Sequence, residues 1–137
     1  MQAHKNKTLT TLFAFLFGGI GLHRFYLRGK ADKWAWLHLL SLPASGLLIA
    51  AFPAWPLFFG LMPLILSGLI AFLETLVIGL TPDEKWDAKY NSASGRHSAS
   101  GWPLAILLVL TVGVGATGLI ATIARSFDLL FTGGAFG

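Results

Sequence analysis

The sequence predicts an all-α integral membrane protein, a small bundle of four transmembrane helices. Of the 137 residues, 55% are hydrophobic and only 12% are charged, whereas a soluble domain is about one quarter charged. The mean hydropathy is +0.70. So few charges could not cover the surface of a water-soluble globule of this size, and a chain of this length is expected to form one domain.

Four apolar stretches are long enough, or nearly so, to cross the bilayer. A helix needs roughly 20 apolar residues to cross about 30 Å of hydrocarbon. The first stretch is the shortest, the third carries one acid, Glu74, and the fourth has no charge. In chain order they are residues 8–22, 34–52, 56–80 and 102–124.

Two of these stretches leave alternatives open. Pro43 lies in the middle of the second, where it removes a backbone hydrogen bond and kinks a helix, although membrane helices tolerate it. The alternative fold therefore has three spans plus a re-entrant or interfacial segment at 34–52. The first stretch follows a cationic start, as in a secretory signal, but no cleavage pattern follows. A retained first span is the preferred interpretation, and a cleaved signal is the alternative.

Lysine and arginine in short loops stay on the cytoplasmic side of a membrane. With four spans, seven cations fall in the loops after the first and third spans, against three on the other side. Three spans would divide the cations five to five. The count favours four spans with both basic loops cytoplasmic and both termini outside. The three outlying cations are Lys5, Lys7 and Arg125.

The chain divides into four parts on this interpretation. Residues 5–80 form the main membrane domain, and residues 81–101 form a polar cytoplasmic loop with a short amphipathic helix. Within that loop, residues 92–101 have the Ser/Gly/Ala composition of a flexible linker. Residues 102–124 form the fourth span, and residues 125–137 a short tail. Tryptophans near the helix ends are expected to anchor at the membrane interface: Trp34, Trp36, Trp55, Trp86 and Trp102.

The stretch GGIGLHRFYLRG at 18–29 has a specific pattern. A glycine cluster closes the first apolar stretch, and a histidine, cations and a Phe-Tyr pair follow. The pattern resembles the start of a TM2 domain, although Arg28 is inserted before the last glycine. The matching residues are Gly18, Gly19, Gly21, His23, Arg24, Phe25, Tyr26 and, one position late, Gly29.

The resemblance covers roughly residues 5–80 and implies a bacterial inner-membrane protein with the signature loop in the cytoplasm. Members of this family have an acid late in their second helix, and Glu74 is the counterpart here. Because Glu74 lies further along than a two-helix domain predicts, the chain would contain an inserted hairpin. The resemblance supplies no mechanism.

Glu74 is the one carboxylate expected inside the hydrocarbon, where a charge is costly unless it is paired or protonated. Arg24 is the nearest expected partner, and His23 is the second choice. The structural interpretation is a buried pair that holds the first helix against the third. A titratable site on a proton or ion pathway, and a carboxylate that reaches the interface, remain as alternatives.

Catalytic and cofactor chemistry has no support in the sequence. Cysteine is absent, which removes disulfides and thiolate sites, and the histidines have no metal-ligand spacing. We therefore expect no enzyme activity, no cofactor and no nucleic-acid partner.

The expected partners are the bilayer and other membrane proteins. Small residues allow helices to approach closely in lipid, and Gly113, Thr117 and Ala121 form such a face, either within the bundle or in a homo-oligomer. The expected function is helix packing, oligomerisation, or partner or lipid binding; the alternative is an oligomeric ion or proton channel or a small transporter using Glu74. The loop expected to contact anionic lipid contains Arg24, Arg28, Lys30 and Lys33.

Overall fold

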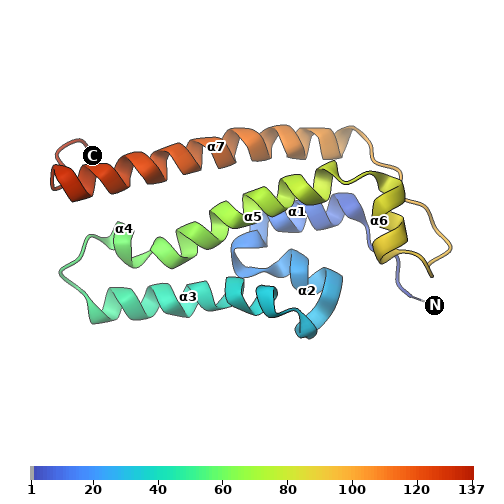
Figure 1. Ribbon diagram of the computed structural model, residues 1–137, viewed down its shortest axis with the longest axis horizontal. Coiled ribbons are helices and arrows are strands. Elements are labelled where there is room, and N and C mark those ends of the chain that lie inside the picture. Colours follow the sequence, from blue (N-terminus) through green and yellow to red (C-terminus); the bar gives the residue numbers. More distant parts are fainter. Residues whose placement is uncertain (1) are drawn as a thin grey trace.

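The computed structural model describes residues 2–137, and every regular element in that range is a helix. Three helices form an elongated bundle: α3 (Lys33–Ala51), α5 (Met62–Leu80) and α7 (Trp102–Phe131) (Figure 1). These three are long and apolar enough to cross a membrane. The fold is therefore an all-α membrane protein, as predicted, with one fewer membrane-length helix than expected.

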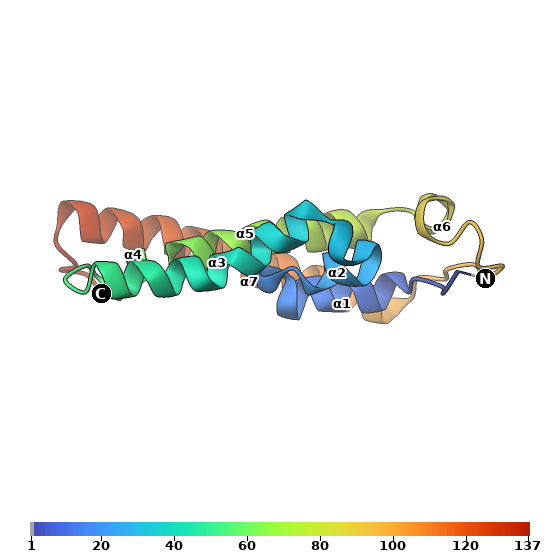
Figure 2. The same cartoon turned by 90° about the horizontal axis from the view of Figure 1, so that it is seen from below.

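The first apolar stretch does not form a membrane-length helix, which corrects the expected span at 8–22. Helix α1 (Lys7–Phe17) has 11 residues, which is about 16 Å of helix. The chain then turns through η1 (Gly18–Ile20), and α2 (Leu22–Arg28) returns toward the end where α1 began (Figures 1 and 2). The Lys5 ammonium donates to the Tyr26 carbonyl at 2.7 Å, which places the end of α2 beside the start of α1.

Two glycines of the signature make this hairpin possible. Gly21 has a φ of +79°, which residues with a Cβ rarely adopt, and a Cβ there would lie 2.7 Å from the Ala35 carbonyl oxygen. At Gly18, a Cβ would lie 2.5 Å from the Ala71 Cβ. The glycines therefore end α1 inside the bundle and pack the turn against both α3 and α5.

The second stretch forms one continuous helix of membrane-spanning length, which argues against a re-entrant segment at 34–52. Pro43 lies inside α3 without ending it. A loop with Phe52 and Trp55 stacked at 4.4 Å follows, and then α4 (Leu57–Gly60) leads into α5. The segment that turns back on itself is instead the α1–α2 hairpin.

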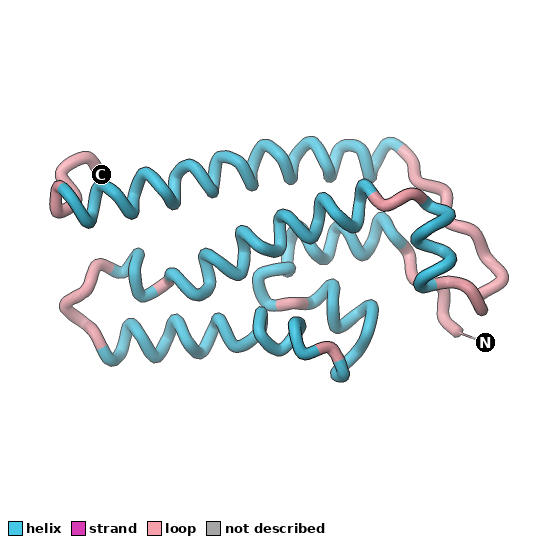
Figure 3. The backbone as a smooth tube through the Cα atoms, in the orientation of Figure 1, coloured by secondary structure: helices cyan, strands magenta, loops and turns pink. Residues whose placement is uncertain are grey.

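The polar loop is folded against the N-terminal segment. Helix α6 (Asp83–Tyr90) buries Trp86, which is 2% exposed and donates its indole N–H to the Lys5 carbonyl at 2.9 Å. Trp86 is therefore a core residue and not the expected interface anchor. Residues 92–101 have no helix or strand (Figure 3), yet Ser98 and Ser100 bond back to α6. The expected flexible linker is a hydrogen-bonded segment.

Helix α7 is longer than predicted, and it packs against α5 through residues other than the expected ones. It continues past 124 to Phe131, because Arg125 pairs with Asp128 one turn on and the charged turn stays helical. The expected packing face of Gly113, Thr117 and Ala121 is exposed and turned away from the bundle. The face against α5 instead includes Gly115, where a Cβ would lie 3.3 Å from Phe72, and Gly118 beside Leu69.

The cations gather at one end of the bundle, which changes the charge count behind the four-span model. The N-terminal segment, the α2–α3 turn and α6 all lie at this end (Figures 1 and 2). Lys5 and Lys7, expected on the opposite side, therefore join the other basic residues. Nine of the ten cations lie at this basic end, and Arg125 alone lies towards the C-terminal end.

Candidate functional site

A polar cluster occupies the interface between the α1–α2 hairpin, α3 and α5. Its centre is Glu74, which α5 places six residues before its end, or about 9 Å along the helix axis. The side chain of Glu74 is 19% exposed. A carboxylate at this depth requires partners, and the folded chain provides three.

Arg24 of α2 is the first partner. Its Nε–H lies 3.0 Å from both carboxylate oxygens of Glu74, and its Nη2 donates to Oε1. Its Nη1 donates to Asp32 Oδ2 at 3.3 Å. Asp32 is 6% exposed and also caps α3 by accepting from the Trp34 backbone N–H at 2.9 Å. The structure thus brings Arg24 and Glu74 together and adds a second carboxylate that sequence reasoning missed.

Two histidines complete the cluster. His23 Nε2 contacts Glu74 Oε2, and His38 Nε2 lies 3.5 Å from the same oxygen. His38 Nδ1 lies 2.7 Å from the Ser67 hydroxyl, which in turn donates to the Gly19 carbonyl at 2.6 Å. Both histidines are buried, at 1% and 6% exposure. The polar network therefore extends from α2 through α5 to the hairpin turn.

A lateral groove of about 510 Å³ opens beside the cluster, between α3 and α5. Arg24 and Glu74 form its polar end, His38 and Ser67 continue the polar groups along its wall, and the rest of the wall is mostly apolar. The other lining residues are Trp34, Leu37, Leu40, Ser41, Ala44, Pro63, Leu66 and Ile70. The groove has the form of a site for an amphipathic molecule, mostly apolar with few polar groups.

A smaller hollow of about 230 Å³ lies on the other side of Arg24 and Glu74. Its wall includes His23, Asp32 and the exposed Arg28, and α6 contributes Lys89 and Tyr90 to it. Arg28 Nη1 lies 3.8 Å from Asp32. The cluster therefore separates a mostly apolar groove from a hollow at the basic end.

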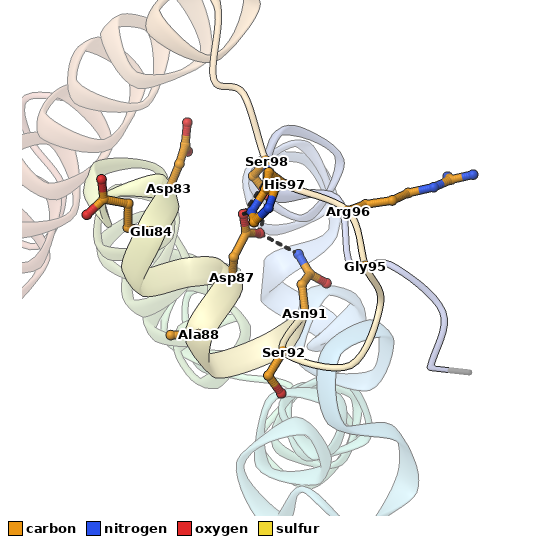
Figure 4. A pocket seen from close by; sticks show the side chains of 10 residues that line it. All are labelled: Asp83, Glu84, Asp87, Ala88, Asn91, Ser92, Gly95, Arg96, His97 and Ser98. Carbon is orange, nitrogen blue, oxygen red and sulfur yellow. Dashed lines mark hydrogen bonds and ion pairs between the residues drawn. The ribbon is translucent and has the colours of Figure 1, made fainter.

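A hollow of about 560 Å³ lies between α6 and the loop that follows it, and its carboxylates hold that loop in place (Figure 4). Asp87 accepts from Asn91 and from the backbone N–H and hydroxyl of Ser98. These hydrogen bonds lower the pKa of Asp87 to about 2. Asp83 likewise accepts from Lys7 and Ser100, which lowers its pKa. Because these two carboxylates are occupied by the fold, the hollow offers no free acidic pair.

The aromatic residues of the signature hold the hairpin. Phe25 packs edge-on against Trp36 at 5.3 Å, and Tyr26 packs edge-on against Phe13 at 5.5 Å. Lys5 lies over the Tyr26 ring at 4.6 Å. Residues 2–137 contain no group of three His, Cys, Asp or Glu side chains arranged to hold a metal ion.

A bacterial relative covers most of this fold. Over 91 residues the chain is 33% identical to the "uncharacterized membrane protein YozV" of Bacillus subtilis (strain 168), a match that spans 66% of this chain and 87% of that protein. The chain belongs to the family of this membrane protein. No family model matches the sequence, and no solved structure matches it.

Membership in this family makes the chain a bacterial-type membrane protein and assigns no reaction to the cluster. The pairing of Arg24 with Glu74 could be predicted from the sequence, because an acid inside the membrane is costly unless it has a partner. His38, Ser67 and Asp32 carried no comparable signal, because a histidine or serine in an apolar helix has many uses and Asp32 lies in a loop. His38 and Asp32 come close to Glu74 only because α3 packs beside α5 and α2, whereas Ser67 lies about two turns before Glu74 on the same helix.

Proposed function

We propose that this chain is a TM2-like protein of the bacterial inner membrane that binds an anionic phospholipid in the groove between α3 and α5. The function is non-catalytic, and the basic end of the bundle faces the cytoplasm. The observation that carries the proposal is the groove itself, which is mostly apolar along its length and ends at Arg24 and Trp34. The signature at 18–29 and the membrane relative support the TM2-like assignment.

The length of the groove suits an acyl chain. Its wall runs on α5 from Pro63 to Glu74 and on α3 from Trp34 to Ala44. At 1.5 Å per residue these intervals cover about 15 Å, which is half of a hydrocarbon core of about 30 Å. A lipid of the leaflet next to the basic end would therefore lie along the groove with its headgroup at the α2–α3 turn.

The charge at the α2–α3 turn favours an anionic headgroup. Arg24 is neutralised by its two carboxylates, but Arg28, Lys30 and Lys33 are exposed around the turn. A cation near the membrane surface contributes about 1 kcal/mol of attraction to anionic lipid. Trp34, which is 62% exposed, suits the headgroup region. This complementarity favours an anionic lipid over a zwitterionic one.

Native mass spectrometry of the protein purified with phosphatidylglycerol and phosphatidylcholine tests this function. The wild type should retain phosphatidylglycerol preferentially. Ala44→Phe, which fills the groove, should lose it. Leu47→Phe is the matched control, because Leu47 lies on the same helix, is 70% exposed and does not line the groove. Equal retention of the two lipids, or equal effects of the two variants, would reject lipid binding in the groove.

A second candidate is proton or ion transport through Glu74. The contacts of His23 and His38 with Glu74 favour it, since proton pathways contain such groups. Flux through reconstituted liposomes tests this candidate. A transporter would lose flux in Glu74→Gln, and liposomes with wild-type protein that conduct no more than empty ones would exclude transport.

A further inference from the structure

We propose that His38 is a proton-binding site that sets the charge at the polar end of the groove. The inference begins with Ser67. The Gly19 carbonyl can only accept, so the Ser67 hydroxyl donates its single hydrogen there, at 2.6 Å. Ser67 must then accept from His38 Nδ1, 2.7 Å away. The Nδ1 atom of His38 therefore carries a hydrogen in every protonation state of the ring.

The other ring nitrogen of His38 faces a carboxylate. In the neutral ring, Nε2 carries a lone pair and lies 3.5 Å from Glu74 Oε2, which is also an acceptor. A proton on Nε2 turns this repulsive contact into a charge-assisted hydrogen bond. The cationic form of His38 thus has an acceptor for each of its two N–H groups, while the neutral form has an acceptor for only one.

His23 differs from His38 in this respect. Its Nε2 contacts Glu74 Oε2 and carries a hydrogen, because a carboxylate only accepts. Its Nδ1 is buried and has no hydrogen-bond partner in residues 2–137. A proton added there would be a buried N–H without an acceptor, which is strongly unfavourable. The added proton of the cluster therefore goes to His38, and His23 stays neutral.

The charged groups nearest His38 are Glu74 of α5, Asp32 at the start of α3 and Arg24 of α2. Arg28 reaches Asp32 only at 3.8 Å with its side chain 48% exposed, and Lys89 lines the hollow beyond Arg24. Both of these cations line the hollow and not the groove that His38 lines.

The consequence for the groove rests on the proposed lipid function. His38 lines the groove, so protonation adds one positive charge to its polar end. An anionic lipid should then be held more tightly with the proton bound, and should be released more readily when the proton leaves.

Solid-state NMR of protein with ¹⁵N-labelled histidine, in phosphatidylcholine bilayers, tests the site directly. The four histidines are assigned with single His→Gln variants. At pH 5, where a free imidazole is protonated, His38 should have both nitrogens protonated and His23 only Nε2. As the pH rises, His38 should lose the Nε2 proton and keep Nδ1–H. A neutral His38 at pH 5, a proton on His23 instead, or an Nε2–H neutral form of His38 would overturn the proposal.

The variant Ser67→Ala tests the role of the hydroxyl. Without that acceptor, neutral His38 should shift to the Nε2–H form and donate to Glu74. Ser41→Ala is the matched control, because Ser41 donates to the His38 backbone carbonyl at 2.6 Å and does not bond the ring. An unchanged His38 spectrum in Ser67→Ala would contradict the assignment.

Lipid retention at pH 5 and pH 8 separates this inference from the proposed function. Stronger phosphatidylglycerol retention at pH 5 in the wild type, absent in His38→Gln, supports the link. If NMR supports the proton site but lipid retention is the same at both pH values, the link between His38 protonation and lipid binding is rejected and the proton site is retained. Loss of all preference for phosphatidylglycerol would reject the lipid function, while the NMR result would still support the proton site.

Discussion

Arg24 illustrates how one side chain serves two carboxylates in this fold. It meets Glu74 through two nitrogens and Asp32 through a third. Removing one partner of a buried pair is costly because the other charge is left unpaired. Replacing Arg24 and replacing Glu74 are not equivalent. Arg24 still pairs with Asp32 when Glu74 is neutralised, whereas both carboxylates lose their guanidinium partner when Arg24 is replaced.

A double-mutant cycle follows from this arrangement. Arg24→Gln should destabilise the fold by about 3 kcal/mol, and Glu74→Gln should cost less because Asp32 still pairs with Arg24. The double variant should lose less than the sum of the two, with a coupling of about 1 kcal/mol or more. Reversible unfolding in detergent measures these free energies. Purely additive effects would contradict the pair.

The stability of the polar loop depends on pH through Asp87, which lies outside the membrane-length helices. Hydrogen bonds from Asn91 and Ser98 lower its folded pKa to about 2, below an unfolded value of about 3.9. Because the pKa of Asp87 is lower in the folded chain, its hydrogen bonds stabilise the loop fully when the pH is above the unfolded pKa. This stabilisation is lost as the pH falls through the folded pKa. The backbone amide resonance of Ser98 should therefore shift as pH falls from about 4 to about 2.

Asp87→Asn should abolish that shift and leave the amide in its acid-form position at neutral pH. Glu84→Gln is the matched control, because Glu84 is exposed on the same helix and should leave the Ser98 titration unchanged. A Ser98 resonance that does not move between about pH 4 and pH 2 in the wild type would contradict the hydrogen-bonded role of Asp87.

At the scale of elements, the α1–α2 hairpin is the feature that brings the cluster together. Helix α1 ends at Phe17, and the turn through Gly21 sends His23 and Arg24 back toward Glu74. A straight first span would have carried these side chains out of the bundle. The close approach of Gly18 to Ala71 holds the turn against α5.

Gly18→Ala should therefore destabilise the protein. A Cβ there would lie 2.5 Å from the Ala71 Cβ, which cannot move without its backbone, and such overpacking costs about 1–3 kcal/mol. Gly113→Ala is the control, since a Cβ there meets nothing within 4 Å and should be neutral or stabilise slightly. Thermal unfolding in detergent compares them, and equal effects would refute the packed turn.

On the scale of the whole molecule, the basic end determines the expected orientation. Nine of the ten cations lie at the end that holds the N-terminal segment, the α2–α3 turn and α6. The positive-inside rule then predicts that this end faces the cytoplasm. The four-span model instead placed the N-terminal segment outside.

Single-cysteine labelling in intact cells tests this orientation, and the chain has no native cysteine to interfere. Cysteines at Ala3, Gly29 and Ser94 should react only from the cytoplasm. Those at Ala54 and Gly134 should react from outside. Labelling of position 3 from outside, with 29 and 94 inside, would restore the four-span model and contradict the hairpin.

The sequence by itself determined the membrane class, three of the spans and the need of Glu74 for a partner, because composition, apolar length and the cost of a buried charge are local properties. It also marked the glycine-rich signature. The tertiary structure alone decided that the first apolar stretch turns back, since that depends on the close approach of Gly18 and Gly21 to α5 and α3. Tertiary packing also decided that His38 and Asp32 join the cluster, because their positions relative to Glu74 depend on how α3 lies against α2 and α5 and not on their spacing along the chain.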